Sequence, residues 1–174
     1  MELKGEQHIL REPDVVWAAL NDPELLKASI PGCETIDLIG ENEYALVMVA
    51  AIGPVKARFK GKMLLSDIQP PQSYKITFEG SGGAAGFGKG QAAVQLAPAE
   101  AEGEGTLLTY QASAQVGGKI AQVGSRLVDG VAAKMAAEFF TRFKAALTEP
   151  GEGTEEEAKA AGGSRWKFWN KSSS

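Results

Sequence analysis

The chain has 174 residues, 18 basic against 22 acidic residues, and a formal net charge of −4. This length suits one domain with a tail, and the nearly balanced charge excludes the strongly basic surface that nucleic acid binding requires. Cys33 is the only cysteine, so an internal disulfide is excluded, and no stretch of about 18 apolar residues predicts a membrane-spanning helix. We therefore expect a soluble body in the cytoplasm.

The N-terminal part predicts one strand and two short helices. Residues 2–10 suit a strand, and Pro13 suits the first position of a helix that runs through Leu20. Asp22 and Pro23 then combine a helix N-cap with a proline at the first helical position, which predicts a second helix over residues 24–28.

From residue 33 the apolar period changes from that of helices to that of strands. Apolar and polar residues alternate between turns such as Gly53-Pro54 and Pro70-Pro71. The predicted strands cover residues 33–39, 44–52, 55–65, 74–78, 91–96 and 108–116. Strands joined by short turns favour an antiparallel sheet.

Residues 117–147 predict one long helix. Small or apolar residues repeat every four positions in two columns. The columns are Leu127, Val131, Met135, Phe139, Phe143 and Leu147, and Ile120, Gly124, Val128, Ala132, Ala136 and Phe140. Such a broad stripe needs a sheet to cover it. We therefore predict an α+β fold in which a curved antiparallel sheet wraps around the long C-terminal helix.

The inward positions of this fold combine large apolar residues with small ones. Gly61, Ala112, Ala114, Ala121 and Gly124 leave room there, which favours a pocket for an apolar ligand. The candidate ligand-binding residues are Phe59, Met63, Phe78, Phe87 and Tyr110, with Ile120, Leu127, Val128 and Val131 as the helical wall. Ordinary core packing with glycine kinks remains the alternative.

The glycine-rich stretch over residues 80–90 resembles two phosphate-binding motifs. Both chemistries need a helix immediately afterwards, whereas residues 91–96 alternate as a strand, so nucleotide binding is rejected. The stretch is either a flexible loop or a mobile rim that carries Phe87 over the pocket mouth. With one histidine and one cysteine in the chain, no histidine-based metal site or nucleophile triad is predicted, and we expect no catalytic activity.

The C-terminal tail combines two compositions. Residues 149–164 are acidic and glycine-rich, which predicts a disordered linker. Residues 165–174 begin with aromatic and basic side chains, which favour the surface of an anionic membrane: Arg165, Trp166, Lys167, Phe168, Trp169 and Lys171. Folding of this peptide onto the domain or onto a partner protein is the alternative.

Several motifs resemble one family. They are Asp22-Pro23-Glu24, residues 30–34, Phe59 with Gly61, Pro70-Pro71 with Tyr74, Gly86-Phe87 with Gly90, and above all residues 116–127. Together they resemble the CoxG family of carbon monoxide dehydrogenase subunits, which is part of the START-like (SRPBCC) superfamily. The resemblance implies a helix-grip domain over residues 1–148 with an apolar cavity. It also implies an accessory protein encoded beside a molybdenum-containing dehydrogenase, without being one of its catalytic subunits.

The functional hypothesis joins these expectations. The protein would bind a hydrophobic small molecule, a lipid or an isoprenoid quinone, under the long helix, with Tyr110 as a donor to a carbonyl. Its tail would hold it on the cytoplasmic face of the inner membrane. Two alternatives stay open: a membrane-recruitment or assembly factor with an incidental pocket, and a small enzyme that acts on a lipophilic substrate.

Overall fold

The computed structural model describes residues 1–99 and 105–148. The chain divides into two units, Met1–Lys144 and Ala145–Ser174, and the arrangement below is that of the first. Its elements in chain order are β1 (Glu2–Ile9), α1 (Pro13–Leu20), α2 (Pro23–Ser29), β2 (Cys33–Gly40), β3 (Glu43–Ile52), β4 (Val55–Gln69), β5 (Ser73–Ser81), η1 (Gly83–Ala85), β6 (Phe87–Pro98), β7 (Thr106–Gly117), α3 (Lys119–Gln122) and α4 (Ser125–Thr148). The tail assigned to residues 149–174 lies outside the described residues.

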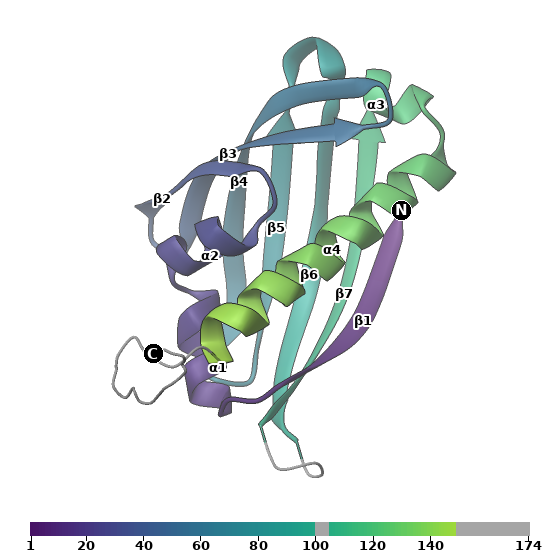
Figure 1. Ribbon diagram of the computed structural model, residues 1–174. Helices are drawn as coiled ribbons and strands as arrows, with labels where there is room; N and C mark the ends of the chain where they lie inside the picture. Colours follow the sequence, from purple (N-terminus) through teal and green to yellow (C-terminus); the bar gives the residue numbers. More distant parts are fainter. Residues whose placement is uncertain (100–104, 149–174) are drawn as a thin grey trace, which may run out of the picture. The chain divides into compact units, whose positions relative to one another are not determined.

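The seven strands form one antiparallel sheet that α4 crosses on one face (Figure 1). The strand order is β1-β7-β6-β5-β4-β3-β2. All neighbours except β1 and β7 are consecutive in the chain, so most of the sheet is a meander of hairpins. The predicted α+β architecture, with a curved antiparallel sheet and a long C-terminal helix, is confirmed.

Both short helices begin where the sequence predicts. Pro13 occupies the first turn of α1, and Pro23 that of α2. The Asp22 side chain accepts a hydrogen bond of 3.0 Å from the Glu24 amide, which satisfies one of the free N–H groups at the start of α2.

The long helix is shorter than predicted, because the chain breaks before it. Residues 119–122 form the separate helix α3, and α4 begins only at Ser125. Between them Gly124 has a φ of 102°, a left-handed conformation that an α-helix does not contain. The prediction of one helix over residues 117–147 was therefore wrong in its first two turns.

The stretch predicted as a glycine-rich loop is largely ordered structure. It contains the short helix η1 and the first residues of β6, which pair with β5 and β7 from Phe87 onward. The inner sides of β4 and β6 carry glycines at points of close approach. A Cβ on Gly61 would lie 2.6 Å from the Glu79 carbonyl oxygen, and one on Gly90 would collide with that of Ser113. The coiling of the sheet therefore depends on these glycines.

Tightly packed residues gather mainly where α1, α2 and the later part of α4 cover the sheet. The buried apolar residues there include Ile9, Val16, Leu20, Leu26, Ile36, Leu65, Val94, Leu96, Leu108, Phe140 and Phe143. A second, smaller group contains Ala85 of η1, Ile120 of α3 and Val128 near the start of α4. The inner face of the sheet between these two groups is packed less completely.

Candidate functional site

The strand register aligns inward-facing side chains in rows across the sheet. One row contains Tyr44, Met63, Phe78, Gly90 and Ala114, each paired with the next on the neighbouring strand. Its large members come from β3, β4 and β5, whereas β6 and β7 contribute only small residues. This row therefore leaves more space under α4 on the β6 and β7 side than on the β3 side.

Large apolar side chains on this face are only partly buried. We call them the inner apolar surface: Leu46, Met48, Phe59, Met63, Ile76 and Phe78 from the sheet, and Val131, Met135 and Phe139 from α4. By contrast, Phe143 in the later part of the same helix has 0% of its surface exposed. Three of the four methionines of the chain belong to this surface. Their flexible thioethers suit a lining that adapts to ligands of different shape.

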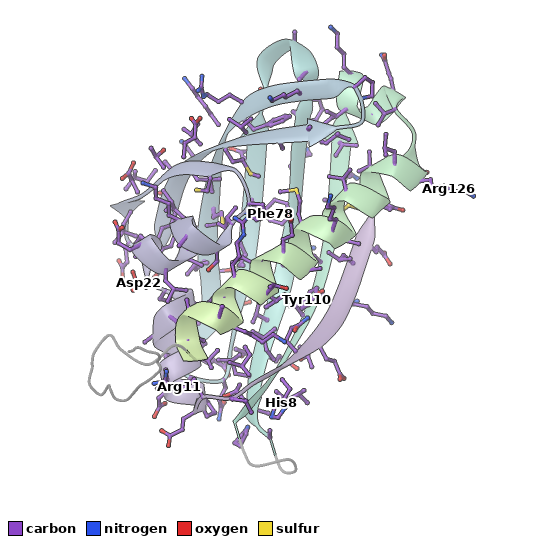
Figure 2. The ribbon with its side chains drawn as sticks, in the orientation of Figure 1. His8, Arg11, Asp22, Phe78, Tyr110 and Arg126 are labelled. Carbon is purple, nitrogen blue, oxygen red and sulfur yellow. The ribbon has the colours of Figure 1, made fainter. Side chains whose placement is uncertain are left out.

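Tyr110 supplies a polar group at the edge of this surface. Its ring stacks on Phe140 of α4 with a centroid distance of 5.3 Å. The ring also lies over Gly5 of β1, where an added Cβ would be 2.7 Å from the Tyr110 hydroxyl oxygen. Figure 2 shows Phe78 and Tyr110 on the strands that α4 crosses. Within residues 1–99 and 105–148 no group hydrogen-bonds to the Tyr110 hydroxyl.

The structure brings together four of the predicted binding residues. Met63 and Phe78 are direct cross-strand neighbours. Phe59 lies on the same face of β4, with its ring against Gly82, and Val131 faces this region from α4 while remaining partly exposed. Tyr110 lies beside this group. The structure adds side chains that the sequence analysis did not assign as lining, namely Leu46, Met48, Ile76, Met135 and Phe139, although Met135 and Phe139 stood in the predicted helical columns.

The other predicted residues lie elsewhere. Val128 is buried, and Ile120 packs against Gly86, so both belong to the smaller packed group. Leu127 is 38% exposed and rests on Gly53 in the turn between β3 and β4. Ala121 and Gly124 are exposed and precede α4, so neither leaves room beneath it. These residues therefore lie around the start of α4 and not in the inner apolar surface.

Phe87 lies on the outer face of the sheet. Its neighbour Gly88 shares the inner row with Val116, so the Phe87 side chain points the opposite way. The ring covers Gly117 and is 49% exposed. The structure therefore does not bring Phe87 to the mouth of a pocket under α4, which corrects the predicted position.

The outer face carries open grooves of a different character. One of about 690 Å³ is lined by residues of six strands, and another of about 560 Å³ lies beside Phe87. Charged side chains border both, including Lys62, Glu79 and Lys89. Their mixed charges are typical of a solvated sheet surface.

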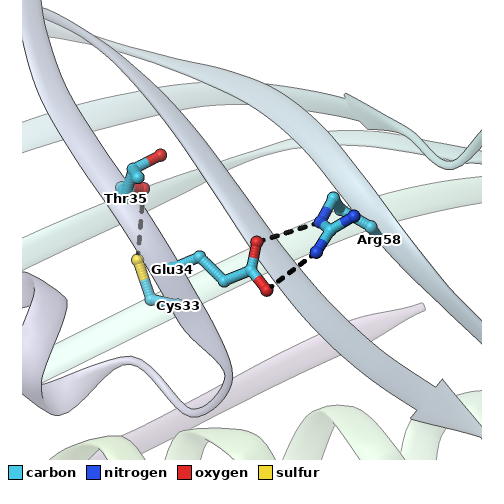
Figure 3. A network of polar contacts seen from close by, with 4 residues as sticks. All are labelled: Cys33, Glu34, Thr35 and Arg58. Atoms are coloured by element: carbon cyan, nitrogen blue, oxygen red, sulfur yellow. Dashed lines mark hydrogen bonds and ion pairs between the residues drawn. The ribbon is translucent and has the colours of Figure 1, made fainter.

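Figure 3 shows the polar network around Cys33, which is the direct cross-strand neighbour of Met48 of the inner apolar surface. The Arg58 guanidinium donates two hydrogen bonds to the Glu34 carboxylate, at 2.9 and 3.1 Å, and joins β4 to β2 across β3. These hydrogen bonds lower the pKa of Glu34. Burial raises the pKa of the Cys33 thiol, which donates to the Thr35 carbonyl oxygen at 3.4 Å. A thiol held in its protonated form is a poor nucleophile at neutral pH.

No group of three or more histidine, cysteine, aspartate or glutamate side chains in the described ranges is placed to hold a metal ion. None of the helices described is long and apolar enough to cross a membrane.

A long helix across a curved antiparallel sheet, with two short helices after the first strand, defines the helix-grip class. A conserved protein from Geobacillus kaustophilus is 34% identical, with a TM-score of 0.77 over 84% of this chain and 94% of its own. Proteins from Mycobacterium smegmatis and Chromobacterium violaceum share the fold at 16% and 14% identity, with TM-scores of 0.60 and 0.59. The first covers 84% of this chain and 90% of its own, and the second 87% and 99%.

The family described as the CoxG subunit of carbon monoxide dehydrogenase matches residues 5–148. The chain therefore belongs to the CoxG family, as the motifs over residues 116–127 predicted. A search of curated proteins found no match.

Proposed function

We propose that the protein is a non-catalytic accessory protein of a carbon monoxide dehydrogenase-type enzyme, and that it binds a hydrophobic small molecule on the inner apolar surface. One observation carries the ligand-binding part. Met63, Phe78 and Met135 lie between two packed regions and remain partly exposed. A ligand that covers such side chains stabilises the complex by about 25 cal/mol per Å² of apolar surface, before the entropy of association is subtracted.

The chemistry of the lining favours an extended apolar molecule. The inner apolar surface consists of aliphatic, aromatic and thioether side chains from two layers, with tyrosine hydroxyls at its borders. A lipid or an isoprenoid quinone has this composition. A molybdenum-containing dehydrogenase must pass its electrons to an acceptor, and a quinone is an apolar acceptor dissolved in the membrane. Family membership supports the link to the dehydrogenase, and the lining supports the apolar ligand.

The proposal assigns no catalytic step to this protein. Cys33 lies opposite Met48 of the inner apolar surface, but burial raises the pKa of its thiol, and a protonated thiol is a poor nucleophile. Among the described residues, the lining defined above contains no acidic or basic side chain that would exchange protons with a substrate. A small enzyme acting on a lipophilic substrate is the competing function, and turnover by the isolated protein would support it.

The proposed location is the cytoplasmic face of the membrane. Its support is the composition of residues 165–174, in which tryptophan and phenylalanine alternate with lysine and arginine. Each basic residue contributes about 1 kcal/mol at an anionic surface, so attachment would be weak and reversible. Weak attachment suits a protein that exchanges between a membrane and a partner enzyme.

The proposal is tested by mass spectrometry of molecules that the purified protein extracts from its own membranes. We expect the full-length chain to retain a stoichiometric isoprenoid or other lipid, and a chain ending at Thr148 to retain less after the same incubation. An unrelated protein of similar size is the control. No enrichment over that control in either form would remove the carrier function.

A recruitment or assembly role is the second candidate, and the aromatic-basic tail favours it. In that case deletion of residues 149–174 would abolish membrane association of the dehydrogenase. Val131→Trp, which fills the space beside α4, would leave that association unchanged. If ligand binding is the function, Val131→Trp should instead reduce the amount of extracted lipid.

A further inference from the structure

Tyr74 is a buried tyrosine at the end of the inner apolar surface nearest α1. It shares a row with Val94 and Tyr110, and only 5% of its surface is exposed. The Trp17 ring of α1 packs edge-on against it, with a centroid distance of 5.2 Å and an interplanar angle of 84°. The ring is therefore held in place from the helix side as well as by the sheet.

The hydroxyl of Tyr74 has no hydrogen-bond partner in the described part of the chain. The nearby Tyr44 hydroxyl, by contrast, donates to the Asn21 carbonyl oxygen at 3.5 Å. Burial, with a smaller contribution from Tyr44, raises the pKa of Tyr74 well above its ordinary value. The phenol thus stays protonated and keeps its capacity to donate a hydrogen bond.

A buried hydroxyl without a partner is unfavourable. Leaving such a donor unsatisfied destabilises the folded state, and nearly all buried polar groups in folded proteins have a partner. Tyr110 does not present the same problem, because its side chain is partly exposed beside the edge strand β1 and water can reach it. Tyr74 is therefore the tyrosine whose hydroxyl most requires a bound molecule.

The position of Tyr74 connects this hydroxyl to the proposed ligand surface. Tyr74, Ile76 and Phe78 alternate along β5 and face the same side of the sheet. At about 3.4 Å per residue, the strand covers roughly 14 Å between the first and the last of them. Ile76 and Phe78 are partly exposed members of the inner apolar surface, so one extended molecule that contacts both can end beside Tyr74.

We propose that Tyr74 donates a hydrogen bond to an acceptor oxygen, such as a carbonyl, at one end of the bound molecule, while the apolar remainder lies along Ile76 and Phe78. This inference rests on the proposed function and adds a chemical requirement and an orientation to it. The preferred ligand is amphipathic, with an oxygen-bearing head at the α1 end of the surface. A pure hydrocarbon of the same shape lacks the group that Tyr74 recognises.

The test compares two probes on full-length wild-type protein and on Tyr74→Phe. One probe is a prenylated naphthoquinone, and the other is the prenylated naphthalene without its carbonyls. Because one neutral hydrogen bond is lost, we expect Tyr74→Phe to bind the quinone about three- to tenfold more weakly than wild type does. The affinity for the hydrocarbon probe should stay the same. Ligand-free Tyr74→Phe should unfold at the wild-type temperature or above it, because no hydrogen bond of the protein is lost.

Thr77→Val is the matched control, because it removes an exposed hydroxyl from the opposite face of the same strand, and it should keep wild-type affinity for both probes. Tyr110→Phe removes the other candidate donor at the border of this surface and so tests the opposite orientation of the ligand. Equal quinone affinity of Tyr74→Phe and wild type would overturn the inference and leave water as the partner of that hydroxyl. A loss confined to Tyr110→Phe would overturn it too, in favour of the opposite orientation. If wild type binds neither probe nor any membrane lipid, the proposed function itself fails.

Discussion

Gly5 and Tyr110 form a contact that fixes the edge of the sheet against α4. The tyrosine ring occupies the space where any larger residue at position 5 would place its Cβ, 2.7 Å from the hydroxyl oxygen and 2.9 Å from Cζ. The same ring stacks on Phe140. Because β1 is an edge strand, the Tyr110 ring connects the backbone of β1 at Gly5 to Phe140 of α4.

Gly5→Ala should therefore destabilise the protein by about 1–3 kcal/mol, because the new methyl group forces the Tyr110 ring away from Phe140. Urea unfolding measures the change. Gly88→Ala on β6 is the control, since a Cβ there meets nothing closer than Val116 Cγ1 at 3.6 Å. It should be neutral or stabilising by up to about 1 kcal/mol. Equal effects of the two substitutions would mean that the Tyr110 ring moves aside freely.

The ion pair between Glu34 and Arg58 predicts a pH dependence. The pKa of Glu34 is lowered in the folded protein, so the pair stabilises the fold above the carboxyl group's unfolded pKa, about 4.3. This contribution is lost as the pH falls through the lowered folded value. The effect is small because both side chains are exposed, at 61% for Arg58 and 42% for Glu34.

Unfolding midpoints of wild type and Glu34→Gln should differ slightly at about pH 7 and converge as the pH falls below about 4. The comparison cancels the titration of the other carboxylates. A difference that persists unchanged at low pH would show that Glu34 contributes through packing and not through its charge.

At the scale of elements, the junction between α3 and α4 depends on Gly124. Its φ of 102° is strained for any other residue, yet a Cβ there would meet no atom within 4 Å. Gly130 offers the opposite case, because it lies within α4 and its Cβ would also meet nothing. Both positions have space for a side chain, but only Gly124 has a backbone conformation that other residues rarely adopt. Comparing the two therefore isolates the effect of the backbone conformation.

Gly124→Ala should lower the free energy of unfolding by about 1–3 kcal/mol through backbone strain, whereas Gly130→Ala should raise it by about 0.5–1 kcal/mol through helix propensity. Thermal unfolding of both variants checks the prediction. We expect the two substitutions to change the free energy of unfolding in opposite directions. Stabilisation by Gly124→Ala would instead mean that α3 and α4 can join into one helix, as the sequence pattern alone suggests.

The repeat of residues every four positions explains why one continuous helix was predicted over residues 117–147. Ile120, Gly124 and Val128 stand four residues apart, so the apolar repeat continues through the break, and only the backbone angle of Gly124 reveals it. Phe87 was misplaced for a related reason. The glycine-rich stretch before β6 has no large apolar side chains, so the sequence does not show which residues of β6 face inward.

At the scale of the whole molecule, the strands, the short helices and the family were predictable from the sequence. Turn residues such as Pro23 and Gly53 fix where elements begin, and alternation fixes their faces. The incomplete packing of Met63 and Phe78 was not predictable in the same way. It depends on how far α4 stands from the sheet and on which rows carry glycine, and both are properties of the assembled layers.

The pairing of β1 with β7 has a consequence for the order of events during synthesis. Strands β2 to β7 pair with their neighbours in chain order and can join one after another as they leave the ribosome. Strand β1, Glu2–Ile9, precedes them in the chain and must wait for Thr106–Gly117 before it can pair. Contacts between residues so far apart in the sequence form slowly, because a long loop must close. We therefore expect β1 to join the sheet late, and the edge of β7 to remain exposed until then.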